Sequence, residues 1–152
     1  MFNGIIFNKG IVNKIKKSTK GVNIFVKSNL KVKNKDLGVS ICCDGVCLTM
    51  VSLKNKVMEF YLLKETMNRS KFKNISIGDK INLELPLKYG QKISGHLCQG
   101  HVDCTSKVNK IIKKGKSRIY DFSIDKNNLS YLIPKASILL NGVSLTISKV
   151  TK

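Results

Sequence analysis

The chain has 152 residues, of which 42% are hydrophobic and none is Trp, and its net charge is +19. This length on its own suggests one domain with a modest core. No run approaches the ~18 consecutive apolar residues of a membrane span, and residues 1–7 lack the charged start and cleavage site of a signal peptide. These features exclude helical membrane proteins and predict a mature cytoplasmic protein.

Alternation of apolar and polar residues predicts short strands along the whole chain. The first strand is expected at residues 1–7, and others at residues 22–27, 81–85 and 120–124. Residues 62–69 are typical of a short helix. Gly and Asn-Gly positions separate these elements as turns. Many short strands in under a hundred residues predict a small closed barrel, since closure removes exposed edges.

The chain also repeats itself with a period of roughly 96 residues. The matches, in order and with a one-residue slip after the second, pair Gly4 with Gly100, residues 12–15 with 108–111, 40–41 with 137–138, 45–46 with 142–143, and 48–49 with 145–146. Several blocks in the same order indicate a duplicated domain. We predict a complete first copy over residues 1–96 and an incomplete second copy over residues 97–152, which ends where about position 55 of the first copy would lie.

Five cysteines, an odd number with two adjacent, do not make a disulfide framework and favour a reducing compartment. His96, Cys98, His101 and Cys104 lie near one another but lack the knuckle spacing of structural zinc sites, so we expect no metal. The 28 Lys and Arg are scattered among expected strand ends and turns. Since no aromatic residues interleave with them as a stacking platform, the charge favours a solvated surface over a nucleic-acid site.

Several blocks together resemble the alpha-type riboflavin synthase family. They are residues 1–6 (MFNGII), 44–49 (DGVCLT), 64–66 (KET), 78–84 (GDKINLE), 94–103 (SGHLCQGHVD) and 142–146 (GVSLT). The resemblance spans the chain in order, and the set is specific although each block alone is weak. It implies an all-β fold of two small six-stranded antiparallel Greek-key β-barrels, the second incomplete here.

The resemblance also implies an activity. Two molecules of 6,7-dimethyl-8-ribityllumazine disproportionate to riboflavin and 5-amino-6-ribitylaminouracil by transfer of a four-carbon unit. No cofactor is expected, because the C7 methyl of the substrate is itself acidic. In the family the working site forms between the N-terminal barrel of one subunit and the C-terminal barrel of a neighbour in a homotrimer. Holding two substrates face to face can contribute ~7–11 kcal/mol.

The resemblance further assigns site residues. Those expected to affect turnover most are Phe2, Ser40, Cys47 and His101. Those expected to bind substrate are Gly4, Ile5, Ile6, Cys47, Leu48, Thr49, Tyr61, Leu62, Leu63, Lys64, Glu65, Thr66, Gly100, His101, Val102, Lys135, Ser144, Leu145 and Thr146. Tyr61 stands where the family usually has Asp, and Ala136 follows Lys135 where it usually has Gly.

Each assignment has a structural alternative. Phe2 can cap a barrel end, Ser40 can satisfy turn backbone, Cys47 can be a core thiol, His101 can be a hydrogen-bonded turn residue, and Glu65 can be a solvated helix charge. Two other functions stay open for the whole chain. One is a non-catalytic lumazine- or flavin-binding module; the other, ranked lower, is a basic β-barrel that binds nucleic acid.

Overall fold

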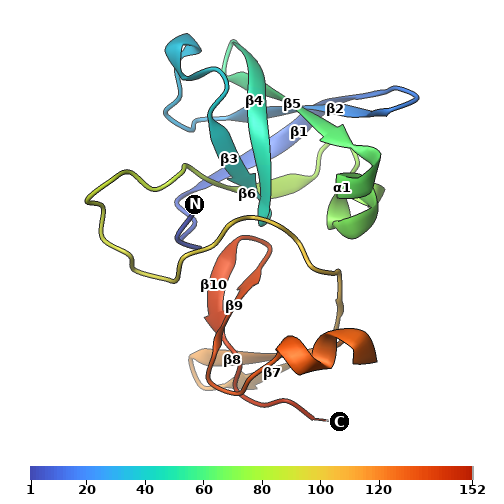
Figure 1. The fold of residues 1–152 in the computed structure, drawn as a ribbon, viewed down its shortest axis with the longest axis vertical. Helices are drawn as coiled ribbons and strands as arrows, with labels where there is room; N and C mark the ends of the chain where they lie inside the picture. Colours follow the sequence, from blue (N-terminus) through green and yellow to red (C-terminus); the bar gives the residue numbers. More distant parts are fainter. Residues whose placement is uncertain (152) are drawn as a thin grey trace.

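In a computed structural model that describes residues 1–151, the first copy forms a closed antiparallel barrel (Figure 1). Its strands are β1 (Asn8–Lys17), β2 (Gly21–Ser28), β3 (Ser40–Cys43), β4 (Val46–Lys54), β5 (Val57–Leu63) and β6 (Lys80–Glu84). They neighbour one another in the order β1-β2-β5-β4-β3-β6, and β6 pairs back to β1. Because β6 follows β5 but lies beside β3, the topology is a Greek key. The predicted fold class is confirmed.

The core of this barrel follows from the alternation in the sequence. In β2 the side chains of Val22, Ile24 and Val26 are buried, and in β5 those of Phe60 and Leu62. Successive side chains of a strand point to opposite faces, so one face of each strand fills the interior. The predicted strand at residues 22–27 is therefore confirmed.

Short helices connect the strands at the rim. They are the 3-10 helix η1 (Asn34–Asp36), the α-helix α1 (Lys64–Arg69) and the 3-10 helix η2 (Lys71–Asn74), which inserts Phe72 into the core. The helix expected over residues 62–69 begins two residues late, because Leu62 and Leu63 still pair with β2.

The expected strand at residues 1–7 is wrong, because β1 begins only at Asn8. Residues 1–7 form a leading segment that makes one isolated bridge, from Phe2 to Cys98. Gly4 has φ +75°, a left-handed conformation that interrupts an extended strand. The N–H groups of Asn3 and Gly4 donate to the Glu84 carboxylate instead of to a neighbouring strand.

The second copy does not close. It consists of the hairpin of β7 (Lys107–Lys114) and β8 (Ser117–Ser123), the 3-10 helix η3 (Lys126–Tyr131), and the hairpin of β9 (Ser137–Leu140) and β10 (Val143–Thr146). The two hairpins are separate two-stranded sheets. Counterparts of β5 and β6 would fall beyond residue 152 by the repeat offset. The duplication is nevertheless visible in detail, because β1 is irregular between Val12 and Lys14 and β7 between the equivalent Val108 and Lys110.

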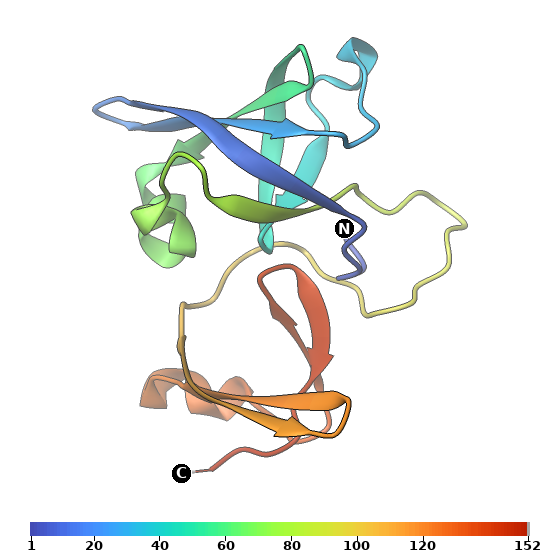
Figure 2. The ribbon, with the colours of Figure 1, turned by 180° about the vertical axis from the view of Figure 1, so that it is seen from behind.

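The two copies meet across an internal pseudo-two-fold axis. Phe2 and Cys98 occupy equivalent positions in the repeat and pair with each other, the N–H of each donating to the carbonyl of the other at 2.8 and 3.0 Å. Gly45 and Gly142 are also equivalent, and a Cβ built on either would lie 3.0 or 3.1 Å from the amide nitrogen of the other. Figures 1 and 2 show the segment after β6 passing between the barrel and the β9–β10 hairpin. The region where this segment contacts both copies is the junction, and the candidate site lies there.

Candidate site between the two copies

The leading segment of each copy, residues 1–7 in the first and the equivalent residues 97–103 in the second, hydrogen-bonds to the other copy. The N–H of Cys47, at the start of β4, donates to the carbonyl of Gly100 at 2.8 Å. In the equivalent contact, the N–H of Ser144 in β10 donates to the carbonyl of Gly4, also at 2.8 Å. Cys47 and Ser144 are the matching positions of the two repeat blocks. The start of one copy therefore completes the edge of the other.

Both residues whose carbonyls accept these hydrogen bonds must be glycine. Gly100 has φ +80° and Gly4 has φ +75°. A Cβ on Gly100 would lie 2.8 Å from the Cys47 Cβ, and one on Gly4 would lie 2.7 Å from the Ser144 Cβ. Both the backbone conformation and the space exclude a side chain. The two glycines let the backbones approach closely enough for the exchanged hydrogen bonds.

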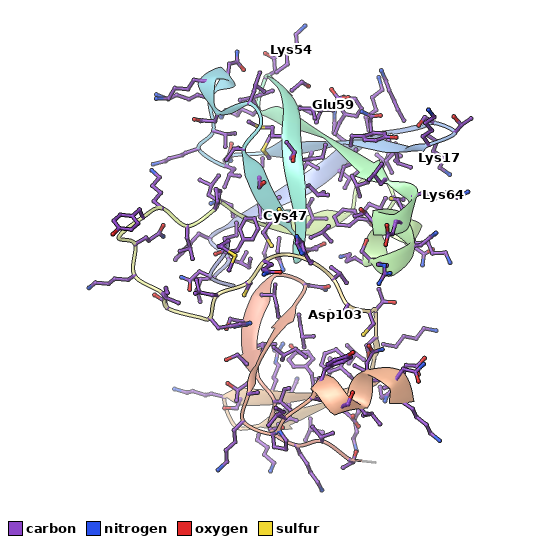
Figure 3. All side chains as sticks on the ribbon, viewed as in Figure 1. Lys17, Cys47, Lys54, Glu59, Lys64 and Asp103 are labelled. Carbon is purple, nitrogen blue, oxygen red and sulfur yellow. The ribbon has the colours of Figure 1, made fainter. Side chains whose placement is uncertain are left out.

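The first of these edges opens into a cleft of about 260 Å³. Its lining residues are Val46, Cys47, Glu65, Thr66, Arg69, Ser70, Gly100, His101 and Val102. The walls are thus the start of β4, helix α1 with the residue after it, and the leading segment of the second copy. Figure 3 shows Cys47 at the end of the barrel that faces the second copy, above the segment that continues to Asp103.

The cleft offers apolar contacts at Val46 and Val102 and a hydroxyl at Thr66. The Ser70 hydroxyl is already engaged, because it donates to the carbonyl of Thr66 at 2.6 Å and accepts the N–H of Phe72. On its α1 wall, Arg69 Nε lies 3.1 Å from Glu65 Oε1, and both side chains are largely exposed. Apolar and polar groups placed together around a small cleft are typical of a site for a small molecule.

Of the predicted substrate-binding residues, the structure brings six together in this cleft. They are Cys47, Glu65, Thr66, Gly100, His101 and Val102. Others on the same strands lie outside it. Ser40 and Thr49 pair across β3 and β4, two positions from the Cys42–Cys47 pair. The side chains of Leu48 and Leu62 are buried in the barrel core, and those of Tyr61, Leu63 and Lys64 are exposed.

Phe2 lies inside the junction. It is fully buried, packs with Cys42 and Cys98, and has the half-buried Cys47 and Leu139 beside it. Burial raises the pKa of Cys42 to about 12, so this thiol is protonated at neutral pH. Phe2 contacts Cys47, which lines the cleft, so Phe2 lies directly behind the cleft wall. Its role in turnover stays a prediction.

The residues predicted for the second edge are partly assembled. Ser144 meets Gly4 as described, and its Oγ lies 2.7 Å from Nδ1 of His96. Ile5 and Ile6 are half-buried in the leading segment, whereas Leu145 and Thr146 are exposed on β10. Lys135 adopts φ +71°, and its N–H donates to the carbonyl of Ile147 at 2.7 Å; its side chain is exposed.

Sequence reasoning missed three residues that line the cleft, Val46, Arg69 and Ser70. A signal existed for Arg69, which stands four residues after Glu65 on an expected helix and thus on the same face. It also missed Glu84, whose contacts with the leading segment depend on residues about 80 positions away. No local pattern contains such a contact.

Fold and site together define a duplicated Greek-key barrel protein with a cleft between its two copies. A family model described as the lumazine-binding domain matches residues 3–86 and 99–152. The chain therefore belongs to the lumazine-binding domain family and is riboflavin synthase-like, as the sequence resemblance predicted.

Relatives and solved structures agree. The chain is 31% identical to the riboflavin synthase of Bacillus subtilis (strain 168), over 100% of this chain and 71% of that protein. It is 32% identical to the riboflavin synthase of Brucella abortus (strain 2308), over 99% of this chain and 77% of that protein. The crystal structure of LumP complexed with riboflavin has a TM-score of 0.84 at 23% identity, covering 99% of this chain and 82% of that one. That structure supports the fold.

Two further observations concern the residues that the structure describes. Within residues 1–151, no group of three or more His, Cys, Asp or Glu side chains is arranged to hold a metal ion. Over the same range, no helix is long and apolar enough to cross a membrane.

Proposed function

We propose that this chain is a riboflavin synthase that converts two molecules of 6,7-dimethyl-8-ribityllumazine to riboflavin and 5-amino-6-ribitylaminouracil. One molecule donates a four-carbon unit to the other, so all atoms of the two substrates are retained in the two products. The C7 methyl of one substrate loses a proton, and the pteridine ring delocalises the resulting carbanion, so the chain needs no cofactor. Its principal task is to orient two flat molecules.

The observation that carries the proposal is the exchange of leading segments across the pseudo-two-fold axis. Gly100 completes the edge at Cys47, and Gly4 completes the equivalent edge at Ser144. A reaction between two copies of one substrate calls for two related surfaces, and this junction builds two related edges. Family membership supports the same conclusion.

Within the cleft, we assign the ring to the space between Cys47 and residues 100–102, and the ribityl chain to the α1 wall at Thr66. His101 is the proposed proton-transfer group, because its imidazole can donate or accept a proton and it lines the cleft. The second substrate would come from the second-copy edge of a neighbouring subunit in a homotrimer.

The test is to incubate the purified chain with 6,7-dimethyl-8-ribityllumazine and to follow riboflavin by its fluorescence. We expect one riboflavin for every two substrate molecules consumed, above the uncatalysed background. His101→Gln should lower kcat by about 100-fold, the size of a typical acid–base contribution, with substrate affinity little changed. Asp103→Asn, two residues further along the same segment, is the matched control and should retain turnover. No riboflavin from the wild-type chain would reject the enzymatic proposal.

A non-catalytic lumazine- or flavin-binding module is the second candidate. It draws support from the likeness in fold to LumP, whose solved structures hold a ribityl-lumazine or riboflavin. This candidate predicts ligand-induced stabilisation of the fold without product. Thermal unfolding with and without ligand, beside the turnover assay, separates the two functions.

A further inference from the structure

We infer that Glu84 is a positioning residue that anchors the leading segment and, through it, sets the shape of the cleft between the two copies. Glu84 ends β6, is only 8% exposed, and pairs with Cys42, which packs against Phe2 and Cys98 of the junction. Its Oε1 accepts the N–H of Asn3 at 2.7 Å and its Oε2 accepts the N–H of Gly4 at 3.0 Å. As a statement about the ligand site, the inference rests on the proposed function.

Among residues 1–151, these two hydrogen bonds from backbone N–H groups are the polar contacts of the Glu84 carboxylate. The ion pairs found within residues 1–151 join Arg69 to Glu65 and Lys71 to Asp44, and neither includes Glu84. Burying a carboxylate is costly unless its oxygens are hydrogen-bonded. Hydrogen bonds from backbone N–H to a carboxylate are roughly twice as strong as neutral ones. Two consecutive N–H groups held by one carboxylate fix both the position and the direction of the chain at Gly4.

From the anchored residues, hydrogen bonds lead to the segment that starts the second copy. The side-chain oxygen of Asn3 accepts the N–H groups of Ser94 and Gly95 at 3.0 and 2.8 Å. Its backbone carbonyl accepts the N–H of His96 at 3.2 Å. Phe2 then pairs with Cys98 in both directions. Residues 94–98 are thus attached to residues that Glu84 holds.

The path ends at both edges of the junction. Two residues after Cys98, the carbonyl of Gly100 accepts the N–H of Cys47, and residues 100–102 line the cleft. On the other side, the carbonyl of Gly4 accepts the N–H of Ser144. One carboxylate of the first copy is therefore linked through hydrogen bonds to both edges.

The alkylation rates of two buried cysteines test the inference without any ligand. Cys98 is 5% exposed and packs against Phe2 in the junction, whereas Cys43 is fully buried in the barrel core. In Glu84→Gln, one carboxylate oxygen becomes an NH₂ that cannot accept the N–H of Asn3 or Gly4. We expect iodoacetamide to alkylate Cys98 at least about 10-fold faster, with Cys43 still protected, as followed by peptide mass spectrometry.

Two further variants sharpen this experiment. Burial, and secondly the Glu84 charge, raise the pKa of Cys98, so removing that charge speeds alkylation by itself. Asn3→Ala keeps the charge but deletes the acceptor for Ser94 and Gly95, and it should also expose Cys98. Glu59→Gln is the matched control, because Glu59 accepts hydrogen bonds from Asn23 and Ser52 and lies away from the junction (Figure 3). It should leave Cys98 protected.

The affinity for riboflavin, measured by flavin fluorescence, is the second readout. Glu84→Gln and Asn3→Ala should raise the Kd at least about 10-fold and Glu59→Gln less than about 2-fold, since only the first two release residues 100–102. Cys98 that stays protected in Glu84→Gln and Asn3→Ala, or that labels in parallel with Cys43, would overturn the inference. A wild-type chain that binds neither riboflavin nor the lumazine would overturn the proposed function alone, because the alkylation result needs no ligand.

Discussion

The two copies of the repeat start from matching sequences and reach different degrees of burial. In the first, Ile15 pairs with Ile24, and Ile24 is fully buried. In the second, the equivalent Ile111 pairs with Tyr120, and both side chains remain more than one-third exposed, at 52% and 43%. The local pairing is the same in both. What differs is the presence of β5 and β6, which complete the barrel of the first copy and have no counterpart within the described residues 97–151. Closure of the barrel, rather than strand pattern, determines burial.

The largest expected effect tests this difference at the equivalent pair Ile24 and Tyr120. Ile24→Ala should lower the free energy of unfolding by about 2–5 kcal/mol, because it leaves a cavity in a closed core. Tyr120→Ala should change it by less than about 0.5 kcal/mol, the usual range for surface positions. Urea unfolding followed by circular dichroism measures both. Equal costs would show that the second copy is also a packed core and would remove the contrast.

A smaller effect is expected where the copies touch. Gly100→Ala should cost about 2–3 kcal/mol, from the left-handed backbone and the lost hydrogen bond to Cys47. Gly38 is the matched control, because it has φ +87° but a Cβ there would meet nothing within 4 Å. Gly38→Ala should cost only the backbone part, about 1–2 kcal/mol. Ligand affinity should fall in Gly100→Ala and stay unchanged in Gly38→Ala, as titration with riboflavin would measure. Equal riboflavin affinities in the two variants would show that the hydrogen bond between Cys47 and Gly100 does not shape the binding site.

The sequence predicted more of the fold than of the junction, for physical reasons. Alternation at Val22, Ile24 and Val26 reports which face of a strand is buried, and this signal is local. The leading segment misled the same reasoning, because MFNGII has a strand-like composition although Gly4 leaves the extended region. Its conformation is decided by Glu84, a contact between residues about 80 positions apart.

The candidate site shows the same limit. Repeat and motif resemblance identified six residues of the cleft, including Cys47 and His101. The matching sequence blocks do not indicate that Gly100 contacts the first copy instead of the second copy, to which it belongs. That exchange arises from the pseudo-two-fold packing of Phe2 on Cys98 and becomes visible only in three dimensions.

Alkaline pH should destabilise the folded chain through the junction thiol Cys42. Burial raises its pKa from an ordinary value of 9.0 to about 12, so the folded state holds the proton more tightly than the unfolded state. The stabilisation is complete below about pH 9 and is lost as the pH rises toward 12. The free energy of unfolding should fall by at most about 1.4 kcal/mol per pH unit from this thiol. Cys42→Ala should flatten that slope, measured by urea unfolding at a series of pH values. An unchanged slope would assign the alkaline loss to other groups.

The smallest effect is expected on the cleft wall, at the Glu65–Arg69 pair of α1. Both side chains are mostly exposed, at 74% and 62%, and the residues stand four apart on a helix. Such pairs contribute about 0.3–0.5 kcal/mol, so Glu65→Gln should change the free energy of unfolding by less than about 0.5 kcal/mol. If barrel closure causes the difference in burial between the two copies, removing a peripheral ion pair from the closed copy should leave that difference unchanged. A loss of more than about 1.5 kcal/mol, beyond any exposed pair, would instead mean that α1 is an integral part of barrel closure.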